Sequence, residues 1–404
     1  MKVAVIGGGA AGFFAAMAVK ENFPSARVII FEKSQKLLAK VKVSGGGRCN
    51  VTNACTSISE LSRAYPRGGK QMKKALAVFN TRHTIEWFES RGVPLYAQDD
   101  GRVFPKTNKS QTIIDLFLSE CERLDIELKL GVGVNAIKVL DNGTVLSFAD
   151  SALEPQSFNK VIVAVGGSPK RAGFAWLEEL GHKIEEPVPS LFTFNMPDET
   201  ITELMGVVAE NALVNIQGTK LRAQGPLLIT HWGMSGPAIL KLSAFGARAL
   251  RKMNYDFKVQ VNWVGEVNNE VVMEQLLNLA DEHPNKLLSN EKPFPLPERL
   301  WQYLLWRSGM PSKKVWGEMG RKVLNRLVNT LCNDISVVKG KTTFKEEFVT
   351  CGGVNLESVD IKTMESKVCK NLYFAGEILD IDGITGGYNF QAAWTTAYLA
   401  GKLS

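Results

Sequence analysis

The stretch that decides the fold is Lys2–Glu32, KVAVIGGGAAGFFAAMAVKENFPSARVIIFE. Its parts alternate between strand and helix signals: an apolar run at 3–6, a G-x-G-x-x-G match over Gly7–Gly12, helix-favouring residues at 13–20 and a second apolar run at 28–31. The glycine motif alone is a weak signal. The full order of strand, glycines, helix, strand and acid is typical of a βαβ unit that binds a dinucleotide.

Each part of this unit has an expected role. Gly7 permits the tight turn, Gly9 lets the backbone approach a pyrophosphate, and Gly12 lets the helix pack close to the strand. The helix N-terminus at Ala10–Ala11 offers free N–H groups and a partial positive charge to the phosphates. Glu32 follows twenty positions after the motif, where a carboxylate can accept hydrogen bonds from a ribose 2′-OH.

Length and composition limit the class of protein. At 404 residues, the chain predicts two or three domains. Its 45% hydrophobic and 22% charged residues are typical of a soluble globular protein, and no run approaches the length of a membrane span. The net charge of +7 suits a ligand that carries phosphate. Six cysteines without a C-x-x-C pair predict a reducing cytoplasm, and four scattered histidines predict no metal site.

Other glycine-rich segments favour ligand binding. Ser44–Asn50, SGGGRCN, predicts an anion-binding loop, because backbone N–H groups and a guanidinium converge there. A buried strand at 160–165 ends on Gly166-Gly167. Near the C-terminus, a strand ends in Gly376-Glu377, and a glycine-rich turn at 383–387 leads into an apolar helix. We therefore predict that the C-terminus supplies the last strand and helix of the nucleotide domain. The middle of the chain predicts a β-rich domain with a helical insertion.

Several motifs together resemble one family. They are GGGAAG at 7–12, SGGGRCNVTN at 44–53, THWGMSGPAIL at 230–240, TCGGV at 350–354 with MESK after it, and FAGEILDIDGITGGYNFQAAW at 374–394. The chain resembles the YhiN/BaiN-like flavoproteins, also called the aminoacetone oxidase family, over nearly its whole length. This resemblance implies non-covalent FAD and an α/β fold: a split Rossmann-like FAD domain of glutathione-reductase type, a β-rich second domain and a helical insertion.

The expected domain boundaries follow from this reading. The FAD-binding domain covers 1–188 and 350–404, the β-rich domain covers 189–264 and 334–349, and the helical insertion covers 265–333.

The resemblance also implies positions around the cofactor. Val134 offers its backbone to the adenine, Glu377 lies near the ribitol, and the segment after Gly386 lies against the pyrimidine edge of the flavin. The full expected set is Gly7, Gly9, Ala10, Ala11, Gly12, Glu32, Lys33, Gly45, Gly46, Gly47, Arg48, Cys49, Asn50, Val134, Gly166, Gly167, Gly376, Glu377, Gly387, Tyr388, Asn389 and Phe390.

The expected chemistry is hydride transfer between flavin N5 and an unidentified small substrate. No second G-x-G-x-x-G follows a strand, so NAD(P)H as electron donor would visit the flavin transiently, without a domain of its own. His231 is the one histidine in a glycine-rich motif. It is a candidate acid or base, and a structural role at a loop–helix junction is the alternative.

Two other functions remain open. A flavin-dependent disulfide reductase needs a closely spaced cysteine pair, and Cys49 and Cys55 have five residues between them where four are usual. Arg48 would favour a thiolate at Cys49 if its sulfur is exposed. A flavin-bearing protein that binds RNA or another partner is suggested by the basic stretch Arg63–Lys74. Lysine and arginine are spread along the chain, however, so a small molecule is the expected partner rather than nucleic acid or a membrane.

Overall fold

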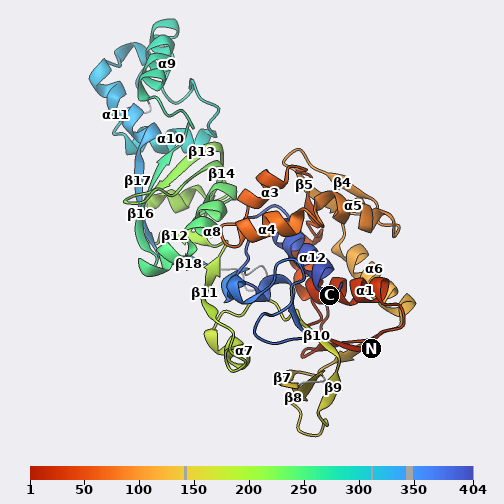
Figure 1. The fold of residues 1–404 in the computed structure, drawn as a ribbon. Helices are drawn as coiled ribbons and strands as arrows, with labels where there is room; N and C mark the ends of the chain where they lie inside the picture. The colour runs from red at the N-terminus through yellow and green to blue at the C-terminus, as the bar shows by residue number, and fades with distance from the viewer. Residues whose placement is uncertain (141–142, 311–312, 343–348, 404) are drawn as a thin grey trace. The chain divides into compact units, whose positions relative to one another are not determined.

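The computed structural model describes residues 1–140, 143–310, 313–342 and 349–403 (Figure 1). These residues divide into two compact units. Unit 1 combines residues 1–190 with 344–404, and unit 2 covers residues 191–343. Both ends of the chain therefore belong to one unit. The three-part division of the chain stays a prediction.

Unit 1 is built on a five-stranded parallel sheet in the order β20-β10-β1-β2-β6. The strand from the C-terminal part of the chain lies at one edge, so this domain is split. Apolar side chains fill the central strands because helices or loops cover both faces of a parallel sheet. The strands are β1 (Lys2–Ile6), β2 (Arg27–Glu32), β6 (Ile126–Leu130), β10 (Lys160–Val163) and β20 (Leu372–Phe374).

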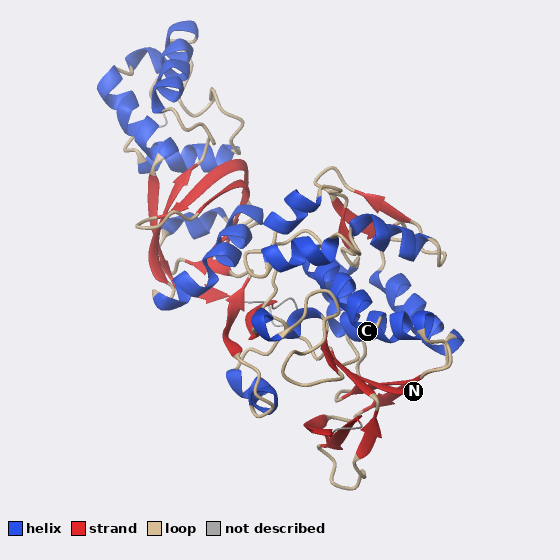
Figure 2. Ribbon diagram, in the orientation of Figure 1, coloured by secondary structure: helices blue, strands red, loops and turns tan. Residues whose placement is uncertain are grey.

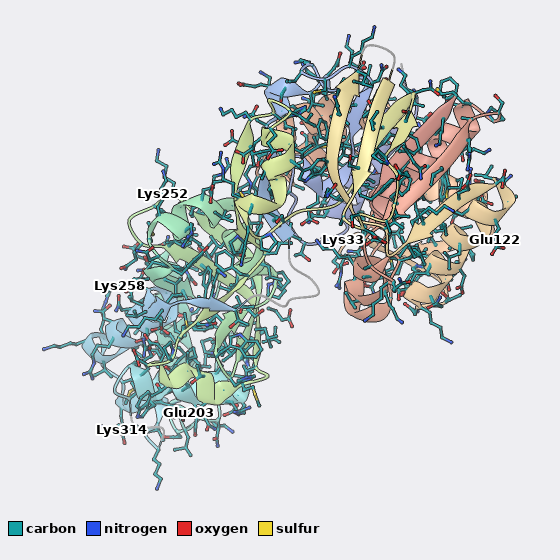
Figure 3. The ribbon with its side chains drawn as sticks, turned by 90° about the horizontal axis from the view of Figure 1, so that it is seen from below. Lys33, Glu122, Glu203, Lys252, Lys258 and Lys314 are labelled. Carbon is teal, nitrogen blue, oxygen red and sulfur yellow. The ribbon has the colours of Figure 1, made fainter. Side chains whose placement is uncertain are left out.

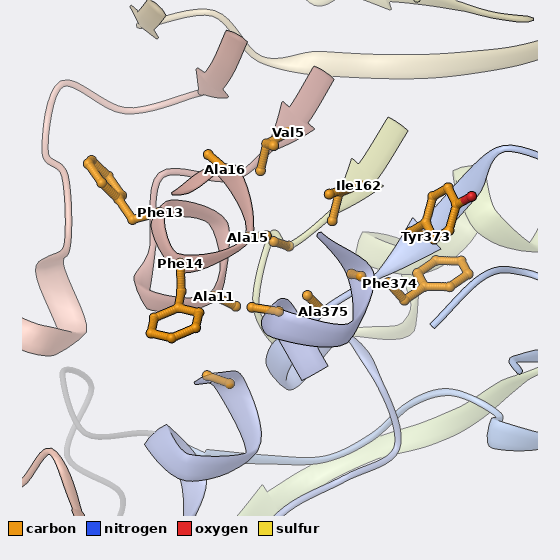
Figure 4. Packing of buried hydrophobic residues seen from close by; sticks show 14 of the residues in the cluster. Val5, Ala11, Phe13, Phe14, Ala15, Ala16, Ile162, Tyr373, Phe374 and Ala375 are labelled. Carbon is orange, nitrogen blue, oxygen red and sulfur yellow. The ribbon is translucent and has the colours of Figure 1, made fainter. Parts of the chain in front are cut away.

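Two helices pack side by side near the middle of this sheet: α1 (Ala10–Asn22) and α12 (Tyr388–Ala400). Figure 4 shows Ala15 of α1 near Ile162 of β10. Residues 11–19 of α1 are all buried, as expected for a helix that is apolar all round. Phe14 and Trp394 join the two helices, with ring centroids 5.4 Å apart. The first and last helices of the chain therefore share one core.

The rest of unit 1 surrounds this sheet with helices and small sheets. The helices are α2 (Ala39–Gly47), α3 (Ile58–Arg63), α4 (Gly69–Leu76), α5 (Thr81–Glu89), α6 (Ser110–Arg123), α7 (Ala175–Glu178), η1 (Arg171–Phe174), η4 (Leu356–Ser358) and η5 (Gly376–Ile378). The strands are β3 (Thr52–Asn53), β4 (Leu95–Ala97), β5 (Arg102–Pro105), β7 (Val134–Leu140), β8 (Gly143–Phe148), β9 (Gln156–Phe158), β11 (Ile184–Ser190) and β19 (Val349–Val354).

Unit 2 contains a seven-stranded antiparallel sheet in the order β17-β16-β13-β14-β15-β12-β18. Helix α8 packs on this sheet, and α9, α10 and α11 gather beyond its end, as Figure 2 shows. The strands are β12 (Thr193–Asn195), β13 (Val208–Ile216), β14 (Arg222–Thr230), β15 (Gly233–Ser235), β16 (Asp256–Asn262), β17 (Asp334–Lys339) and β18 (Lys341–Thr342). The helices are α8 (Pro237–Lys252), α9 (Asn269–Glu282), α10 (Glu298–Arg307), α11 (Arg321–Cys332), η2 (Thr200–Leu204) and η3 (Trp316–Glu318).

Each unit has a hydrophobic core of its own. Within the described ranges, no helix is both long and apolar enough to cross a membrane. No group of three or more His, Cys, Asp or Glu side chains in those ranges could hold a metal ion.

Candidate cofactor site

The carboxyl ends of the central strands of unit 1 meet at one edge of the sheet. Backbone hydrogen bonds align them: Gly7 N–H donates to Phe31 at 2.8 Å, and Ala375 N–H donates to Val163 at 3.0 Å. Ligands of open α/β sheets bind outside this edge. The structure therefore brings the glycine-rich turns from both ends of the chain to the place where such a fold binds a nucleotide.

The glycines of the first turn serve two purposes. A Cβ at Gly7 would lie 2.4 Å from the Ala164 oxygen, and one at Gly12 would lie 1.9 Å from the Gly7 oxygen. Packing within the protein therefore requires glycine at both positions. A Cβ at Gly9 would meet no atom within 4 Å. Gly9 caps α1 without a side-chain hydrogen bond, so the space above it lies at a helix N-terminus and suits a pyrophosphate.

Glu32 is fixed beside this turn by two backbone groups. One carboxylate oxygen accepts the Gly8 N–H at 2.7 Å, and the other accepts the Ser34 N–H at 2.9 Å. A carboxylate has about four acceptor sites, so it can accept further bonds from a ribose. A Cβ at Gly133 would lie 3.4 Å from Lys33 Cβ. Gly133, which directly precedes Val134, is therefore a neighbour of Lys33, which directly follows Glu32. Lys33 is exposed (Figure 3).

The triple-glycine loop is open and left-handed. Gly45, Gly46 and Gly47 have φ angles of 56°, 68° and 81°, and a Cβ at either of the last two would meet nothing within 4 Å. The Arg48 guanidinium lies 4.1 Å from the centroid of the Phe104 ring, which fixes this cation beside the loop. This arrangement suits an anion.

Cys49 and Asn50 point into the protein instead. Cys49 is 0% exposed, and burial raises the pKa of its thiol to about 12. The condition for a thiolate at Cys49, an exposed sulfur, is therefore not met: burial raises the pKa of this thiol and outweighs the opposing hydrogen bond with the Ser44 side chain. The Asn50 side-chain oxygen accepts the Val103 N–H at 3.2 Å. The backbone N–H of Cys49 is also engaged, since it donates to the Ser44 oxygen at 3.0 Å.

Glu377 joins three segments that border the same edge. Its carboxylate accepts the Thr350 N–H at 2.9 Å and the Lys40 ammonium at 2.5 Å. A Cβ at Gly167 would lie 3.0 Å from the same carboxylate and 2.6 Å from the Thr350 hydroxyl oxygen. Lys40 and Thr350 were not identified from the sequence as candidate site residues. Each lies close to a glycine motif, and this nearness is the signal that could have identified them.

Gly376 brings the two ends of the chain together. A Cβ at Gly376, which has a φ of 77°, would lie 2.7 Å from Ala11 Cβ at the start of α1. The first glycine motif and the Gly376-Glu377 pair therefore lie side by side.

The C-terminal turn presents backbone rather than side chains. A Cβ at Gly387, with φ at 90°, would lie 2.3 Å from the Thr52 oxygen, so packing on β3 requires this glycine. The Asn389 amide accepts the Gly383 N–H at 2.8 Å and donates to the Gly383 oxygen at 2.9 Å. The Phe390 ring stacks on Trp394 at 5.5 Å. Helix α12 has no side-chain cap, so its first N–H groups suit a polar ligand edge.

Other contacts hold this turn from the N-terminal half of unit 1. Asn53 donates to the Gly386 oxygen at 3.1 Å, and the Tyr65 hydroxyl donates to the Tyr388 oxygen at 2.8 Å. Arg67 forms an ion pair with the buried Asp382. The basic stretch Arg63–Lys74 is therefore interrupted at its centre by a structural residue.

His231 belongs to unit 2. It lies exposed in the turn between β14 and β15, with its ring 4.1 Å from that of Trp232. Its imidazole makes no hydrogen bond with any residue that the structure describes. Its role as acid or base stays a prediction.

The geometry of unit 1 fits FAD. Two helices begin without side-chain caps, one carboxylate is fixed beside the first turn, and open glycines lie between them. Groups of these kinds suit the phosphates, a ribose and the ring edge of a dinucleotide.

Comparison with known proteins agrees with this fit. A family model described as "HI0933-like protein Rossmann domain" matches residues 1–403. A "3-dehydro-bile acid delta(4,6)-reductase" of Clostridium scindens is 28% identical over 413 residues, covering 99% of this chain and 98% of the relative. A "Ribosomal RNA dihydrouridine synthase" of Escherichia coli is 28% identical over 403 residues, covering 98% of this chain and 95% of the relative.

Solved structures show the same fold. A 3-ketosteroid delta1-dehydrogenase from Sterolibacterium denitrificans superposes with a TM-score of 0.52 at 12% identity, covering 99% of this chain and 98% of that one. A 3-ketosteroid-delta4-(5alpha)-dehydrogenase from Rhodococcus jostii gives a TM-score of 0.50 at 10% identity, with 99% and 95% covered. The predicted fold class and the resemblance to the YhiN/BaiN-like flavoproteins are confirmed.

Proposed function

The chain belongs to the HI0933-like family, and we propose that this FAD-dependent oxidoreductase reduces a carbon–carbon double bond conjugated to a carbonyl group. One observation carries the proposal. Two relatives that are equally similar to this chain over nearly their full length are named for different substrates, but both names describe the reduction of the same kind of double bond. A 3-oxo steroid with double bonds at positions 4 and 6 is a conjugated enone. Dihydrouridine forms when the double bond of uracil, which is conjugated to a carbonyl, is reduced.

The shared bond dictates the chemistry. The carbonyl withdraws electrons, so the far carbon of the double bond accepts a hydride and the near carbon accepts a proton. FAD, when bound, supplies the hydride through its N5 atom. The protein's part is to bind and orient the cofactor and to stabilise charge that develops during transfer.

Different residues of unit 1 would contact different parts of the cofactor. The N-terminus of α1, at Ala10 and Ala11, would hold the pyrophosphate, and Glu32 would hold the adenosine ribose. The N-terminus of α12, after Gly387, would direct its positive end at the pyrimidine edge of the ring. A helix terminus contributes about 0.3–1 kcal/mol to a nearby negative charge, and up to about 2 kcal/mol when partly buried. This end of the site would therefore favour the reduced flavin.

Three further assignments are part of the proposal. NAD(P)H reduces the flavin during a transient visit. The hydride acceptor is a small molecule or a nucleobase, the two kinds named for the relatives. The protein works in a reducing cytoplasm, which is consistent with its six free cysteines. A disulfide reductase is less well supported, because Cys49 is buried with a pKa of about 12.

Reoxidation of the reduced enzyme tests this function. The protein is reduced with dithionite without oxygen and mixed with 2-cyclohexen-1-one, with cyclohexanone as matched control. We expect the flavin absorption to return only with the enone, and the product to be cyclohexanone. Reoxidation by oxidised glutathione but not by the enone would instead support a disulfide reductase. A second series with a 3-oxo-4,6-diene steroid and with ribosomal RNA separates the two substrate kinds.

A further inference from the structure

One face of helix α11 in unit 2 carries only basic and amide side chains. Its exposed residues recur with helical spacing, and the opposite side packs into the core of unit 2 through Leu324, Leu327, Val328 and Leu331. We call the exposed side the α11 basic face. It consists of Arg321, Lys322, Asn325, Arg326 and Asn329.

The charges of this face are not neutralised within the described part of the protein. The side chains of Arg321, Lys322 and Arg326 form no ion pair or hydrogen bond there. Two other arginines of unit 2 are engaged: Arg307 pairs with Asp334 at 2.5 Å, and Arg299 donates to the backbone oxygen of Glu203 at 2.8 Å. The first turn of α11 contains no acid, so its positive charges lie beside the positive end of the helix dipole.

The charge of α11 contrasts with that of the helix that packs against it. Helix α9, which packs against α11, contains four acidic residues and no basic one: Glu270, Glu274, Asp281 and Glu282. Helix α11 contains three basic residues and no acidic one. Neighbouring helices of one core therefore present opposite charge, which indicates that the α11 basic face is directed at an anionic partner.

We propose that the α11 basic face binds the phosphate backbone of ribosomal RNA. This inference rests on the proposed reductase function and assigns its substrate to the nucleobase kind. Arginine and lysine bind phosphate oxygens, and amides such as Asn325 and Asn329 reach phosphate or sugar hydroxyls. Arg321 and Arg326 are about 7.5 Å apart along the helix axis. This length corresponds to about two phosphates of one strand.

A charge-matched pair of variants tests the assignment. The first is Arg321→Gln/Lys322→Gln/Arg326→Gln. The control is Lys241→Gln/Lys252→Gln/Lys258→Gln, which removes three exposed cations elsewhere in unit 2, two of them labelled in Figure 3. Both are titrated with transcribed bacterial 16S and 23S ribosomal RNA over a range of salt concentrations.

We expect the α11 variant to bind RNA at least tenfold more weakly at low salt, and the control to bind as the wild type does. The slope of log affinity against log salt should become shallower by about 2 in the α11 variant, since three phosphate contacts are lost. FAD content and reoxidation by 2-cyclohexen-1-one should stay unchanged in both.

Three results would overturn the inference. They are unchanged RNA affinity, equal weakening in both variants, and a change in sedimentation with RNA binding intact, which would assign the face to a second copy of the chain. The proposed function fails separately, when the enone does not reoxidise the wild-type flavin.

Discussion

Arg67 and Asp382 form a buried ion pair between the N-terminal part of unit 1 and the turn that leads into α12. The Arg67 Nε donates to Asp382 Oδ1 at 2.5 Å, and the Asp382 side chain is 0% exposed. Ser190 donates to the same carboxylate at 2.8 Å. Burial raises the pKa of Asp382, and the Arg67 guanidinium opposes that rise. The pair positions the backbone that the proposed site presents to the flavin edge.

Removal of one partner should destabilise unit 1. Arg67→Met would leave Asp382 buried without its cation, which typically costs about 3–5 kcal/mol. The double variant Arg67→Met/Asp382→Asn should lose less, because no unpaired charge remains. Urea unfolding of both measures the difference. Equal stability of Arg67→Met and the wild type would show that the pair does not hold this turn.

Glu32 should contribute to FAD affinity. Glu32→Ala removes the acceptor for the ribose and for the Gly8 N–H. A buried polar group left unpaired costs about 1–3 kcal/mol, and each 1.4 kcal/mol is about tenfold in affinity. Titration of the apoprotein with FAD measures this loss, with the exposed Glu154→Ala as control. If both variants bind FAD as the wild type does, the assignment of Glu32 is wrong.

The protein should lose stability at high pH. Burial raises the pKa of the Cys49 thiol from 9.0 to about 12 and that of Cys332 to about 11. The unfolded thiols ionise near pH 9 while the folded ones stay protonated, so the stabilisation is complete below pH 9 and is lost as pH rises toward 12. Urea unfolding across this range should show the fall. In the double variant Cys49→Ala/Cys332→Ala, the free energy of unfolding should fall less steeply with pH. A fall as steep as that of the wild type would contradict this prediction.

His231 gives a test of the proposed acid or base. If its imidazole moves the proton, His231→Gln should lower kcat and remove one limb of the pH profile. The FAD spectrum should stay unchanged. A structural role at the β14–β15 turn predicts instead lower stability with an unchanged pH profile. The pH dependence of kcat/KM for both proteins distinguishes the two.

The sequence was sufficient for the fold of unit 1 because its signals are local. The order of apolar runs and glycines in Lys2–Glu32 identifies β1, α1 and β2, and the same order near Gly376 identifies the split domain. The close approach expected at Gly9 stays a prediction that the open space there suits, whereas the packing reason for Gly387 was not predicted from the sequence. Its constraint comes from Thr52, more than three hundred residues away, and no local pattern shows such a contact.

The remaining differences also come from long-range packing. Arg67 was read as part of a basic surface, and its partner Asp382 lies near the other end of the chain. Cys49 follows an arginine, which favours a thiolate, but its burial depends on the whole core. A single sequence shows neither burial nor pairing at these separations.

The proposed site places FAD over Gly9, and one substitution tests this placement directly. Gly9→Ala adds a methyl group that meets no protein atom within 4 Å, in an extended conformation that alanine can adopt. Gly320→Ala is the matched control, since Gly320 caps α11 in an extended conformation with the same free space. FAD titration of both apoproteins is the measurement. We predict similar stability for the two variants, and at least a tenfold loss of FAD affinity for Gly9→Ala alone. Unchanged FAD affinity in Gly9→Ala would contradict the account.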